Sequence, residues 1–599
     1  MATQTFVVQT HRQQRNSKPG IRPQHTPGSK QRSLSGGPWY SRNPVTWLLI
    51  LILTVAAILR LSNLDRTPAG FHVDEAANAW NAYCLLKTGN DQHGVRWPVF
   101  YLRAFGDNRS SLFVYTLLPF QAVGGLSVWT TRLAAATGGI LTVFLIYWVG
   151  TKLFGVRVGL GSAAMLALNP WHLQQSRWGH EASLVPLLTL ISVAALLWAQ
   201  LPLKTGASLH RQPLKAALAG AVLGICCYGY PAIRVFLPVF LIGVFPVNLR
   251  GWWSQPRTRQ GMMATFFFIL SLITILGPLV WKHLRDPEIN QRARTTQVWT
   301  DADSIGERIH KVWDRYPGHF GIDFLFLNGD KDIALSPPTG TGLFLWDSLA
   351  WMFLGIIVLV KTFASSGASR ILAVWLVTYP VGDLLYHHVS LHSLRSLPGL
   401  PALVLLAVLG IVHAVQWLWR CHRNVRWAAV IVVASAMLVL NVRFLDEFYR
   451  EFYQSPDKQK VLYADDLLKA SQWLKPRLSD ADAVFCTSRM IAHPYIYTLI
   501  GMQYDPGQWL RDEKNIVKGP LANGDYANEE ECVSYGKLHF IVDDFHAGAL
   551  DRLSNNNRSD RVIFIVRPGE LGIESKIRPV EVIEDRFGHK SLLIFDGHL

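Results

Sequence analysis

The chain has 599 residues, of which 50% are hydrophobic and only 17% are charged, and it contains 22 tryptophans. This composition excludes an ordinary string of soluble domains and is typical of a membrane protein that also carries some soluble mass. The formal net charge of +16 would indicate nucleic-acid binding only if the cations gathered on one folded face.

Residues 1–43 contain much Gln, Ser, Gly and Pro, together with seven Lys and Arg. They hold too few apolar groups to form a core, which predicts a disordered basic tail. Because this long segment precedes the first apolar run and no small-residue cleavage site follows that run, we interpret the run as an uncleaved first span and not as a secretion signal.

Long apolar runs then follow from residue 44 to residue 441. Most of them approach the ~20 residues that a helix needs to cross about 30 Å of hydrocarbon. The run at 158–170 is short and the run at 214–230 contains Gly220 and Gly224, so the predicted number of spans is about eleven. The runs are 44–61, 130–149, 158–170, 182–199, 214–230, 233–248, 262–281, 342–360, 371–386, 396–418 and 427–441.

The positive charge is concentrated on one side of these runs. If the N-terminus is cytoplasmic, the segments on its side hold 20 of the 58 Lys and Arg and none of the 42 Asp and Glu. Retention of Lys and Arg in the cytoplasm is the normal topology signal of a membrane protein, so the excess argues against nucleic-acid binding. An odd number of spans in the bacterial inner membrane then places the C-terminal region outside the cytoplasm. The basic segments are 1–45, 150–158, 200–216, 249–260, 361–370 and 419–427.

Three stretches are predicted to lie on the external side. The first two, 62–129 and 282–341, are loops within a transmembrane domain at 44–441. The third, 442–599, combines an amphipathic helix at Ala464–Leu478 with short β-rich runs, which predicts an extracytoplasmic α/β domain. The β-rich runs are Ala483–Thr487, His539–Val542, Arg561–Val566, Val580–Ile583 and Ser591–Phe595. The fold class is therefore mainly α and polytopic, with an α/β appendage.

The acidic pair Asp74 and Glu75 follows the first span. Two such acids can be solvated loop residues or can stabilise a helix N-terminus. Because adjacent side chains point in different directions, they cannot both address one atom, which argues against a carboxylate pair of the glycosidase kind. One acid acting as a base while the other orients a partner stays open.

Four arginines lie at predicted external membrane boundaries. Two interpretations fit Arg109, which follows Asp107: its guanidinium extends to lipid headgroups, or it binds a phosphate. Arg177, Arg234 and Arg395 lie on the same side, which suggests that they share one anion-binding site.

Three histidines precede Arg395, and His392 is the nearest of them. No carboxylate nearby completes an obvious metal set, so hydrogen bonding to structure or substrate is the favoured interpretation. Metal-assisted chemistry stays open. We therefore assign no metal ligand.

The order of several motifs resembles the bacterial polyprenyl-phosphate-dependent glycosyltransferases with the GT-C fold, a family 39-like group similar to protein O-mannosyltransferases and aminoarabinose transferases. The resemblance runs from about residue 44 to the external domain. It is carried by Phe71–Ala76, Leu86–Asp91, Gly94–Pro98, Ala104–Arg109, Thr131–Leu133, Asn169–His172, Ser176–Arg177, Glu181, Ala232–Pro238, Phe324–Phe326 with Gly329–Asp330, His392–Pro398, Pro494–Tyr497 and Tyr504–Pro506.

The resemblance implies that Asp74 is the acidic residue at the reaction centre, that Glu75 supports it, and that Arg109 meets the lipid phosphate. Two prolines often follow the basic residue in this family, whereas Ser110 and Ser111 follow it here, which affects the expected backbone shape more than the charge.

The implied reaction moves a sugar from a polyprenyl phosphate to a hydroxyl of a protein, glycolipid or polysaccharide. Mannose is suggested by analogy alone, no cofactor is certain, and a divalent metal stays open. The departing phosphate needs cationic stabilisation, for which Arg109 and Arg395 are the first candidates and Arg177 and Arg234 the second.

Two other classes of protein compete with this interpretation. A transporter or flippase usually carries ionisable groups near the middle of the membrane, whereas here they gather at one face. A non-catalytic envelope assembly protein would use 442–599 to bind a partner. The sequence also leaves open whether Cys486 and Cys532 form a disulfide in an oxidising compartment.

Overall fold

The computed structural model describes residues 44–199, 212–247, 259–290, 297–332, 341–386, 391–450, 463–512, 516–520, 530–541, 561–571, 578–585 and 588–598. The predicted tail at 1–43 and two of the three histidines, His387 and His388, lie outside these residues. The description that follows concerns the unit from Val45 to Leu599.

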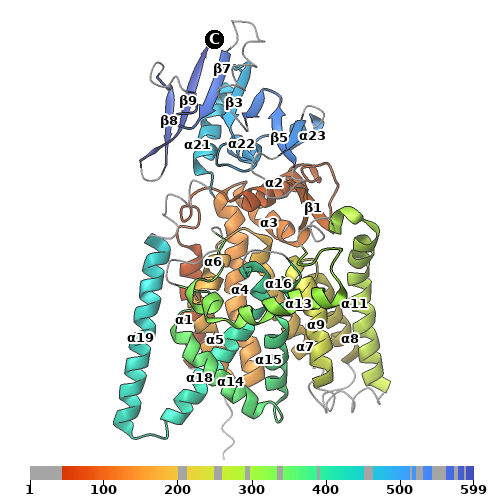
Figure 1. Cartoon of the computed structure of the whole chain (residues 1–599), viewed down its shortest axis with the longest axis vertical. Coiled ribbons are helices and arrows are strands. Elements are labelled where there is room, and N and C mark those ends of the chain that lie inside the picture. Colours follow the sequence, from red (N-terminus) through yellow and green to blue (C-terminus); the bar gives the residue numbers. More distant parts are fainter. Residues whose placement is uncertain are drawn as a thin grey trace, which may run out of the picture. The chain divides into compact units, whose positions relative to one another are not determined.

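Each of the eleven predicted apolar runs coincides with a helix or a pair of consecutive helices (Figure 1). Among the described residues, six helical stretches are long and apolar enough to cross a membrane by length and composition. This confirms a membrane protein, while the number of eleven spans stays a prediction. The elements are α1 (Pro44–Leu61), α4 (Val128–Phe154), α5 (Val156–Leu168), η1 (Glu181–Leu184) with α7 (Val185–Trp198), α8 (Gln212–Cys226), α9 (Pro231–Val247), α11 (Arg259–Arg285), α14 (Asp347–Thr362), α15 (Gly367–Thr378) with α16 (Val381–Leu384), α17 (Ser393–Ser396), η6 (Leu397–Gly399) and α18 (Leu400–Leu418), and α19 (Arg423–Arg450).

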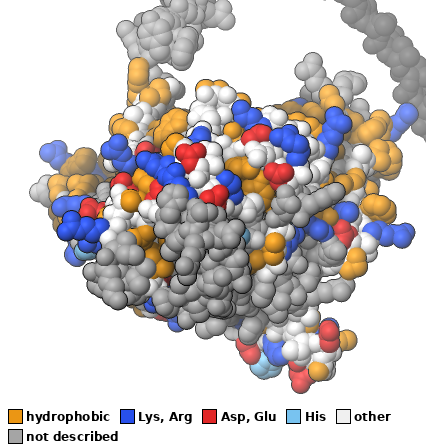
Figure 2. All heavy atoms as spheres, turned by 90° about the horizontal axis from the view of Figure 1, so that it is seen from above, with side chains coloured by type: hydrophobic (Ala, Val, Ile, Leu, Met, Phe, Trp, Pro, Cys, Tyr) orange, Lys and Arg blue, Asp and Glu red, His pale blue; other side chains and the backbone are white. Residues whose placement is uncertain are grey.

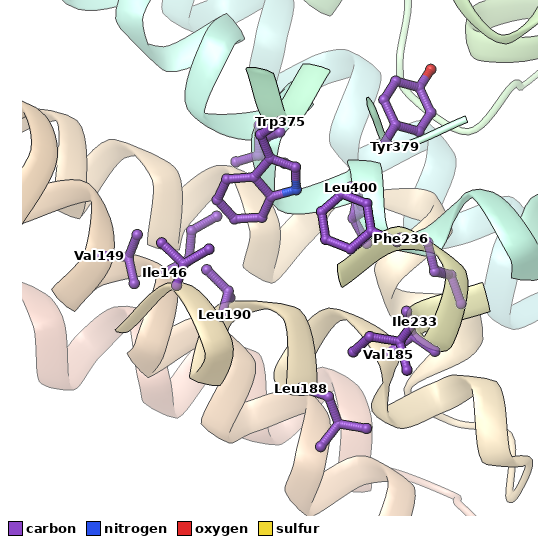
Figure 3. Close-up of a cluster of buried hydrophobic side chains, with 14 of the residues drawn as sticks. Ile146, Val149, Val185, Leu188, Leu190, Ile233, Phe236, Trp375, Tyr379 and Leu400 are labelled. Atoms are coloured by element: carbon purple, nitrogen blue, oxygen red, sulfur yellow. The ribbon is translucent and has the colours of Figure 1, made fainter. Parts of the chain in front are cut away.

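The core of the helical part lies where α4, α7, α9, α15 and α18 meet (Figure 3). Phe236 of α9 and Trp375 of α15 are both completely buried there. The indole Nε1 of Trp375 donates a hydrogen bond to the carbonyl of Pro398 at 2.8 Å. A polar atom in this apolar core is thus satisfied by backbone at the bend before α18, as burial requires.

Close helix packing explains why the apolar run at 214–230 contains two glycines. A Cβ atom at Gly220 would lie 2.3 Å from the carbonyl oxygen of Phe268, and one at Gly224 would lie 2.7 Å from Ile275. Both contacts belong to α11, so the glycines let α8 and α11 approach closely. Small residues serve this purpose in membrane helices, where lipid provides no hydrophobic drive for association.

The polar segments between the apolar runs carry short elements that precede or connect the long helices. The stretch 62–129 contains two helices and a hairpin, and the described part of 282–341 contains one helix and several single turns. These elements are α2 (Val73–Thr88), β1 (Tyr101–Ala104), β2 (Asp107–Ser110), α3 (Ser111–Gly124), α6 (Pro170–Gln175), η3 (Pro287–Asn290), α13 (Ile305–Arg315), η4 (Tyr316–Phe320) and the π-turn η5 (Asp323–Leu327).

The C-terminal part forms one mixed seven-stranded sheet with the strand order β4-β5-β6-β3-β7-β9-β8. The central strand β3 pairs in parallel with β6 and β7, and the outer pairs are antiparallel. This confirms the predicted C-terminal α/β fold. The elements are α21 (Asp465–Leu474), η8 (Lys475–Arg477), β3 (Ala483–Thr487), α22 (Pro494–Met502), α23 (Pro506–Arg511), β4 (Ile516–Pro520), β5 (Glu530–Tyr535), β6 (Leu538–Ile541), β7 (Arg561–Val566), β8 (Glu581–Glu584) and β9 (Lys590–His598).

Alternate residues of the central strand face two separate hydrophobic clusters, as the period of a strand requires. Val484 and Cys486 join a cluster with α21 and α22, whereas Ala483 and Phe485 join a second cluster on the other face. The first cluster also contains Trp80 and other side chains of α2. The sheet domain and the first external helix therefore share one core.

Local pattern predicted some elements of this domain and missed others. The strands at Ala483–Thr487 and Arg561–Val566 are observed with the predicted bounds, and the helix predicted at Ala464–Leu478 is observed as α21 followed by η8. The analysis missed α22, α23, β4 and β5. In addition, α19 continues to Arg450, nine residues past the predicted end of its apolar run. Phe448 on this extension packs with Leu173 of α6, which supplies the burial that prolongs the helix.

Figure 2 shows the end of the unit that carries the sheet. Lys and Arg, Asp and Glu, and hydrophobic side chains are interspersed over the described surface in this view. Mixed signs at this end agree with the sequence, where the basic excess belongs to the other side of the apolar runs.

The sequence left open whether Cys486 and Cys532 form a disulfide. In the structure all six cysteines are free thiols. Cys486 lies on β3 and Cys532 on β5, and β6 runs between these two strands. Two strand spacings of ~4.8 Å separate their Cα atoms. A disulfide requires Cα atoms within about 7 Å, so this pair cannot be joined without rearranging the sheet.

We expect all six cysteines to react with an alkylating reagent when the protein is denatured without a reductant. The intact mass would then rise by six adducts, as it does after reduction. A mass that is two adducts short before reduction would contradict the free-thiol arrangement.

Candidate functional site

The N-terminus of α2 orients the two acids that the sequence singled out. The Nδ1 atom of His72, the N-cap residue, accepts a hydrogen bond from the backbone N–H of Asp74 at 3.2 Å. In return, the backbone N–H of His72 donates to Glu75 Oε2 at 3.0 Å. This reciprocal capping box defines the start of the helix and sends the two adjacent carboxylates in different directions.

Glu75 points into the protein and forms a completely buried ion pair. Its two oxygens accept from Arg132 Nε at 2.8 Å and Nη2 at 2.7 Å, and the backbone N–H of Gly179 donates to Oε1 at 2.8 Å. Burial raises the pKa of Glu75, but Arg132 and these backbone donors lower it by more, and the net pKa lies below its ordinary value. Glu75 is therefore an ionised anchor with no exposed surface.

Arg132 ties this anchor to the turn between α1 and α2. Its Nη1 donates to the carbonyls of Leu64 and Pro68, and its Nη2 donates to the carbonyl of Gly70. The guanidinium thus joins α4 to the chain immediately before Asp74. The sequence analysis quoted Arg132 only as part of a motif and did not identify it as the partner of Glu75.

The side chain of Asp74 is 19% exposed, whereas that of Glu75 is completely buried. Its Oδ1 lies 2.6 Å from Nη1 of Arg109, and its Oδ2 lies 3.5 Å from Nε2 of His180. Burial raises the pKa of Asp74, but Arg109, with His72 and His180, lowers it by more, so the pKa lies well below its ordinary value. The structure thus brings together Asp74 and Arg109, which are 35 residues apart in the chain.

His180 is a site residue that sequence analysis missed. Its Nδ1 accepts a hydrogen bond from the backbone N–H of Ala182 at 3.0 Å, which leaves the proton of a neutral ring on Nε2. That Nε2 lies 3.1 Å from Glu181 Oε2 and therefore bridges Glu181 and Asp74. The ring also stacks on Trp178, with centroids 4.7 Å apart. Its place beside Glu181 in an external polar segment was the available signal.

The hairpin β1–β2 presents Arg109 to Asp74. Its two turn residues, Phe105 and Gly106, have φ angles of 58° and 76°, as a tight two-residue hairpin turn requires. A bulky side chain at positive φ is strained, so surrounding contacts must hold Phe105 there. The ring of His493, from the sheet domain, stacks on Phe105 with centroids 3.9 Å apart, and the Arg109 guanidinium lies 5.5 Å from the same ring.

The sheet domain therefore reaches the edge of the site through His493. Burial and, to a smaller extent, Arg109 lower the pKa of His493 to about 3, so this ring is neutral near pH 7. A neutral ring can stack on Phe105 without repelling Arg109. Asp107 lies in the same hairpin, where its Oδ1 accepts the backbone N–H of Asn108 at 2.8 Å, and its charge adds to the field that stabilises the cation of Arg109.

Arg234 packs against the residue that follows Arg109. Its Nη2 donates to Ser110 Oγ at 2.7 Å, and Ser110 Oγ donates to the carbonyl of Gly229 at 2.8 Å. Ser111 Oγ donates to the carbonyl of Val99. Prolines could not make these side-chain bonds, so the two serines replace a rigid backbone with hydrogen bonds. Ser110 connects the end of β2 to α9, and Ser111 connects the start of α3 to the chain before β1.

Arg177 occupies a different environment from the other candidate arginines. Its Nη1 donates to the carbonyls of Leu59, Arg60 and Ser62 at the end of α1, at distances of 2.9 to 3.0 Å. The residue is 1% exposed. Such contacts are typical of a cation that caps a helix C-terminus, where its positive charge also interacts favourably with the helix dipole.

His392 and Arg395 lie in a second polar cluster on and beside α17. The backbone N–H of His392 donates to Asp383 Oδ2 at 3.2 Å, and the backbone N–H of Ser393 donates to Asp330 Oδ2 at 2.6 Å. The Arg395 guanidinium lies 3.7 Å from the ring centroid of Tyr386. Its buried Nη1 has no hydrogen-bond partner among the described residues.

Glu181 acts electrostatically on both Arg109 and Arg234. Arg395 lies beside the same helix as Arg234, because its carbonyl and Ala232 of α9 both pack against Gly382 of α16. Three of the four candidate arginines thus share one region with Asp74, whereas Arg177 is bound to the backbone of α1. Among the described residues, no group of three or more His, Cys, Asp or Glu is spaced to hold a metal ion, so we assign no ligand set to the divalent metal.

No family model and no curated protein matches the chain. Solved structures do. ArnT from Cupriavidus metallidurans bound to undecaprenyl phosphate aligns with a TM-score of 0.53 at 12% identity, over 92% of this chain and 98% of that one. The apo form of the same protein aligns with a TM-score of 0.52 at 13% identity over the same shares. The Archaeoglobus fulgidus oligosaccharyltransferase tethered with an acceptor peptide aligns with a TM-score of 0.51 at 12% identity, over 92% of this chain and 74% of that one.

These similarities show that the chain has the GT-C fold of membrane glycosyltransferases, which confirms the resemblance and the fold class predicted from its motifs. At this level of identity the shared property is the fold. The activity must be argued from the site.

Proposed function

We propose that this protein is a glycosyltransferase that moves a sugar from a polyprenyl-phosphate lipid to an acceptor hydroxyl outside the cytoplasm. The observation that carries the proposal is the contact between Asp74 and Arg109 at 2.6 Å, beside Arg234 and Arg395, on a GT-C fold. An acid and several cations at one face suit a phosphate-linked sugar, because one group must take a proton while the others receive negative charge. The similar ArnT structure, with undecaprenyl phosphate bound, supports this donor class.

The proposed reaction is a direct displacement at the anomeric carbon, with inversion as the resemblance implies. The acceptor oxygen forms a bond to that carbon while the bond from the carbon to the phosphate oxygen breaks. The electron pair leaves with the phosphate, which remains on the lipid as a monoester, and the acceptor proton moves to Asp74. Arg109 and Arg395 would stabilise the additional negative charge on the phosphate.

The contact with Arg109 also makes Asp74 a weak base before the donor binds, because it holds the pKa of the carboxyl low. A donor phosphate would compete for the same guanidinium. Once Arg109 moves towards the phosphate, the burial of Asp74 is no longer offset and its pKa rises. Donor binding would therefore activate the base at the time when it is needed.

The other candidate residues would support this centre. Glu75 would hold the N-terminus of α2 through Arg132, and Asp107 would assist the cation of Arg109. Arg234 would position Ser110 and the hairpin, and His392 would position α17. We propose a structural role for Arg177, in place of the phosphate contact considered from sequence.

The remaining proposals concern placement. A cytoplasmic N-terminus in the bacterial inner membrane would put the site and the sheet domain on the extracytoplasmic side, in agreement with the charge distribution. The acceptor would then be a protein, glycolipid or polysaccharide of the envelope, and mannose is one sugar to test among several.

The experiment uses purified protein in lipid with a panel of radiolabelled polyprenyl-phosphate sugars and a crude envelope fraction as acceptor. We expect label to leave one donor lipid for the acceptor, and Asp74→Asn protein to leave it in the lipid. Movement of intact labelled lipid between leaflets without transfer would instead support a flippase. Equal transfer by both proteins would remove Asp74 from the mechanism.

A second prediction concerns the donor phosphate. We expect Arg395→Gln to raise the donor KM by roughly 10–100-fold, since a hydrogen bond to a charged group contributes ~1.5–3 kcal/mol, and Arg395→Lys to lose less. Arg177→Gln would instead lower the melting temperature, because Arg177 binds the backbone of α1. Steady-state kinetics and thermal unfolding of the three variants separate these effects. An unchanged donor KM in Arg395→Gln would exclude Arg395 from the phosphate site.

A further inference from the structure

The helix α13 (Ile305–Arg315) is a self-contained amphipathic segment in the second external stretch. It begins with a capping box: Ser304 Oγ accepts the backbone N–H of Glu307 at 3.3 Å, and Glu307 Oε2 accepts the backbone N–H of Ser304 at 2.7 Å. These bonds satisfy two of the orphan donors at the helix start. The helix is therefore defined by its own sequence, although none of its residues is buried.

Three large apolar side chains of α13 are exposed and lie on one face. Ile305, Ile309 and Trp313 follow one another at intervals of four residues and are 77%, 64% and 66% exposed. Residues at this spacing form a single stripe along a helix. The stripe continues after the helix with Phe320 and Ile322, which are also exposed. A row of this kind on a water-exposed surface marks an interaction site.

The opposite face of α13 carries charges of both signs. Lys311 pairs with Asp303 at 2.5 Å, and Asp314 pairs with His310 at 2.6 Å. The cations Arg308, Lys311 and Arg315 are matched in number by Asp303, Glu307 and Asp314, so the polar side has no strong net charge that would select a charged macromolecule. The apolar stripe is what distinguishes this helix.

Contacts at its C-terminal end connect α13 to the end of one predicted span. Arg315 Nη2 lies 3.5 Å from the buried Asp383 of α16, and Tyr316 Oη donates to the carbonyl of Val377 in α15 at 2.8 Å. Val377 itself is 59% exposed. In Figure 1, α13 (light green) runs across the direction of α8 and α9. The helix thus lies at the level where the apolar runs end, crosswise to them.

We propose that α13 lies in the interface of the outer leaflet, with Ile305, Ile309 and Trp313 inserted among the lipids. Tyr316, which stacks on Trp313 of the stripe, binds the carbonyl of Val377 in α15, and the exposed side chain of Val377 faces hydrocarbon if α15 spans the membrane. In this placement the same lipid layer covers the stripe of α13 and the apolar surface of α15. Trp313 and Tyr316, which stack with centroids 5.5 Å apart, are the residue types enriched at that depth.

The test uses the full-length protein in nanodiscs of phosphatidylethanolamine and phosphatidylglycerol, with a nitroxide spin label at one introduced cysteine. Five native cysteines are buried and only Cys421 is partly exposed, so a Cys421→Ser background leaves one reactive position. Ile309→Cys reports the stripe and Asp314→Cys reports the opposite face. Val432→Cys, on the exposed side of α19, provides a hydrocarbon reference, and Ile305→Cys repeats the measurement if Ile309→Cys does not fold.

We expect the label at 309 to relax faster with oxygen than with a water-soluble nickel chelate, as at 432, and the label at 314 to show the reverse. Equal access of the nickel chelate at 309 and 314 would overturn the proposal, because the stripe would then face water. Protection of 309 from both reagents would also overturn it, in favour of a protein contact such as a second copy. The result does not depend on sugar-transfer activity.

Discussion

Asp74→Asn is expected to lower kcat for sugar transfer by about 10²–10⁴-fold, the usual contribution of a positioned base, while the donor KM stays the same or falls. The amide keeps the shape of the side chain but cannot accept the acceptor proton. It also releases Arg109 from its 2.6 Å contact, which leaves the guanidinium free to meet the donor phosphate. Transfer of radiolabel from the donor lipid, measured over a range of donor concentrations, separates kcat from KM.

The matched control is Asp65→Asn, an exposed acid in the same external stretch, which should transfer at the normal rate. A rise in KM without loss of kcat in Asp74→Asn would instead assign Asp74 to donor binding. Intact folding of both variants, checked by their melting temperatures, is required for either conclusion.

The pH dependence of the same reaction tests how Arg109 acts on Asp74. Folding lowers the pKa of Asp74 below its unfolded value of about 3.9. The ionised carboxylate therefore stabilises the folded protein above that pH, and this stabilisation is lost as the pH falls through the lower folded pKa. The kcat/KM profile, which reports the free enzyme, should accordingly show no acid limb from Asp74 between pH 5 and 8. In Arg109→Gln the burial of Asp74 is no longer offset, and its acid limb should move upwards. An unchanged profile in that variant would show that Arg109 does not control the carboxylate.

Breaking the buried pair of Glu75 and Arg132 is expected to produce the largest loss of stability. Arg132→Met leaves Glu75 charged and unpaired in the interior, and removing one partner of such a pair costs about 3–5 kcal/mol. It also removes the donors to the carbonyls of Leu64, Pro68 and Gly70. We expect a much lower yield of folded protein and a lower melting temperature, measured in detergent with and without lipid.

The double variant Glu75→Gln with Arg132→Met tests whether the unpaired charge is the cause. Because it leaves no buried charge behind, it should be more stable than Arg132→Met alone. A double variant as unstable as the sum of the two single losses would attribute the effect to the backbone contacts of Arg132 and not to the ion pair.

Patterns along the chain determined much of the architecture. Apolar runs, Lys and Arg counts and short β-rich segments depend on neighbouring residues, so they predicted the long helices, the membrane class and five of the strands before any contact was known. Motif order identified the GT-C fold. The same patterns missed α22 and α23, since Pro494–Met502 is buried all round and lacks the polar face by which a helix is recognised from sequence.

The site shows the same division at the level of side chains. Asp74 and Arg109 could be selected from sequence because acids and arginines at a membrane boundary are conspicuous there. The sequence placed Arg177 in one rank with Arg234, although the two have different partners, because those partners lie far away in the chain. Arg132 pairs with Glu75 across 57 residues, Arg177 reaches carbonyls about 115 residues earlier, and Arg109 meets Asp74 and lies 5.5 Å from the ring that stacks on His493.

The sequence by itself thus determined where the long apolar helices and the sheet domain lie along the chain, and it singled out the acids and arginines beside them. Only the tertiary structure decided which acid is partly exposed, which arginine meets it and which residues hold them. The physical reason is that hydropathy and charge act locally along the chain. Burial, hydrogen-bond partners and pKa instead depend on what folding brings within a few ångströms.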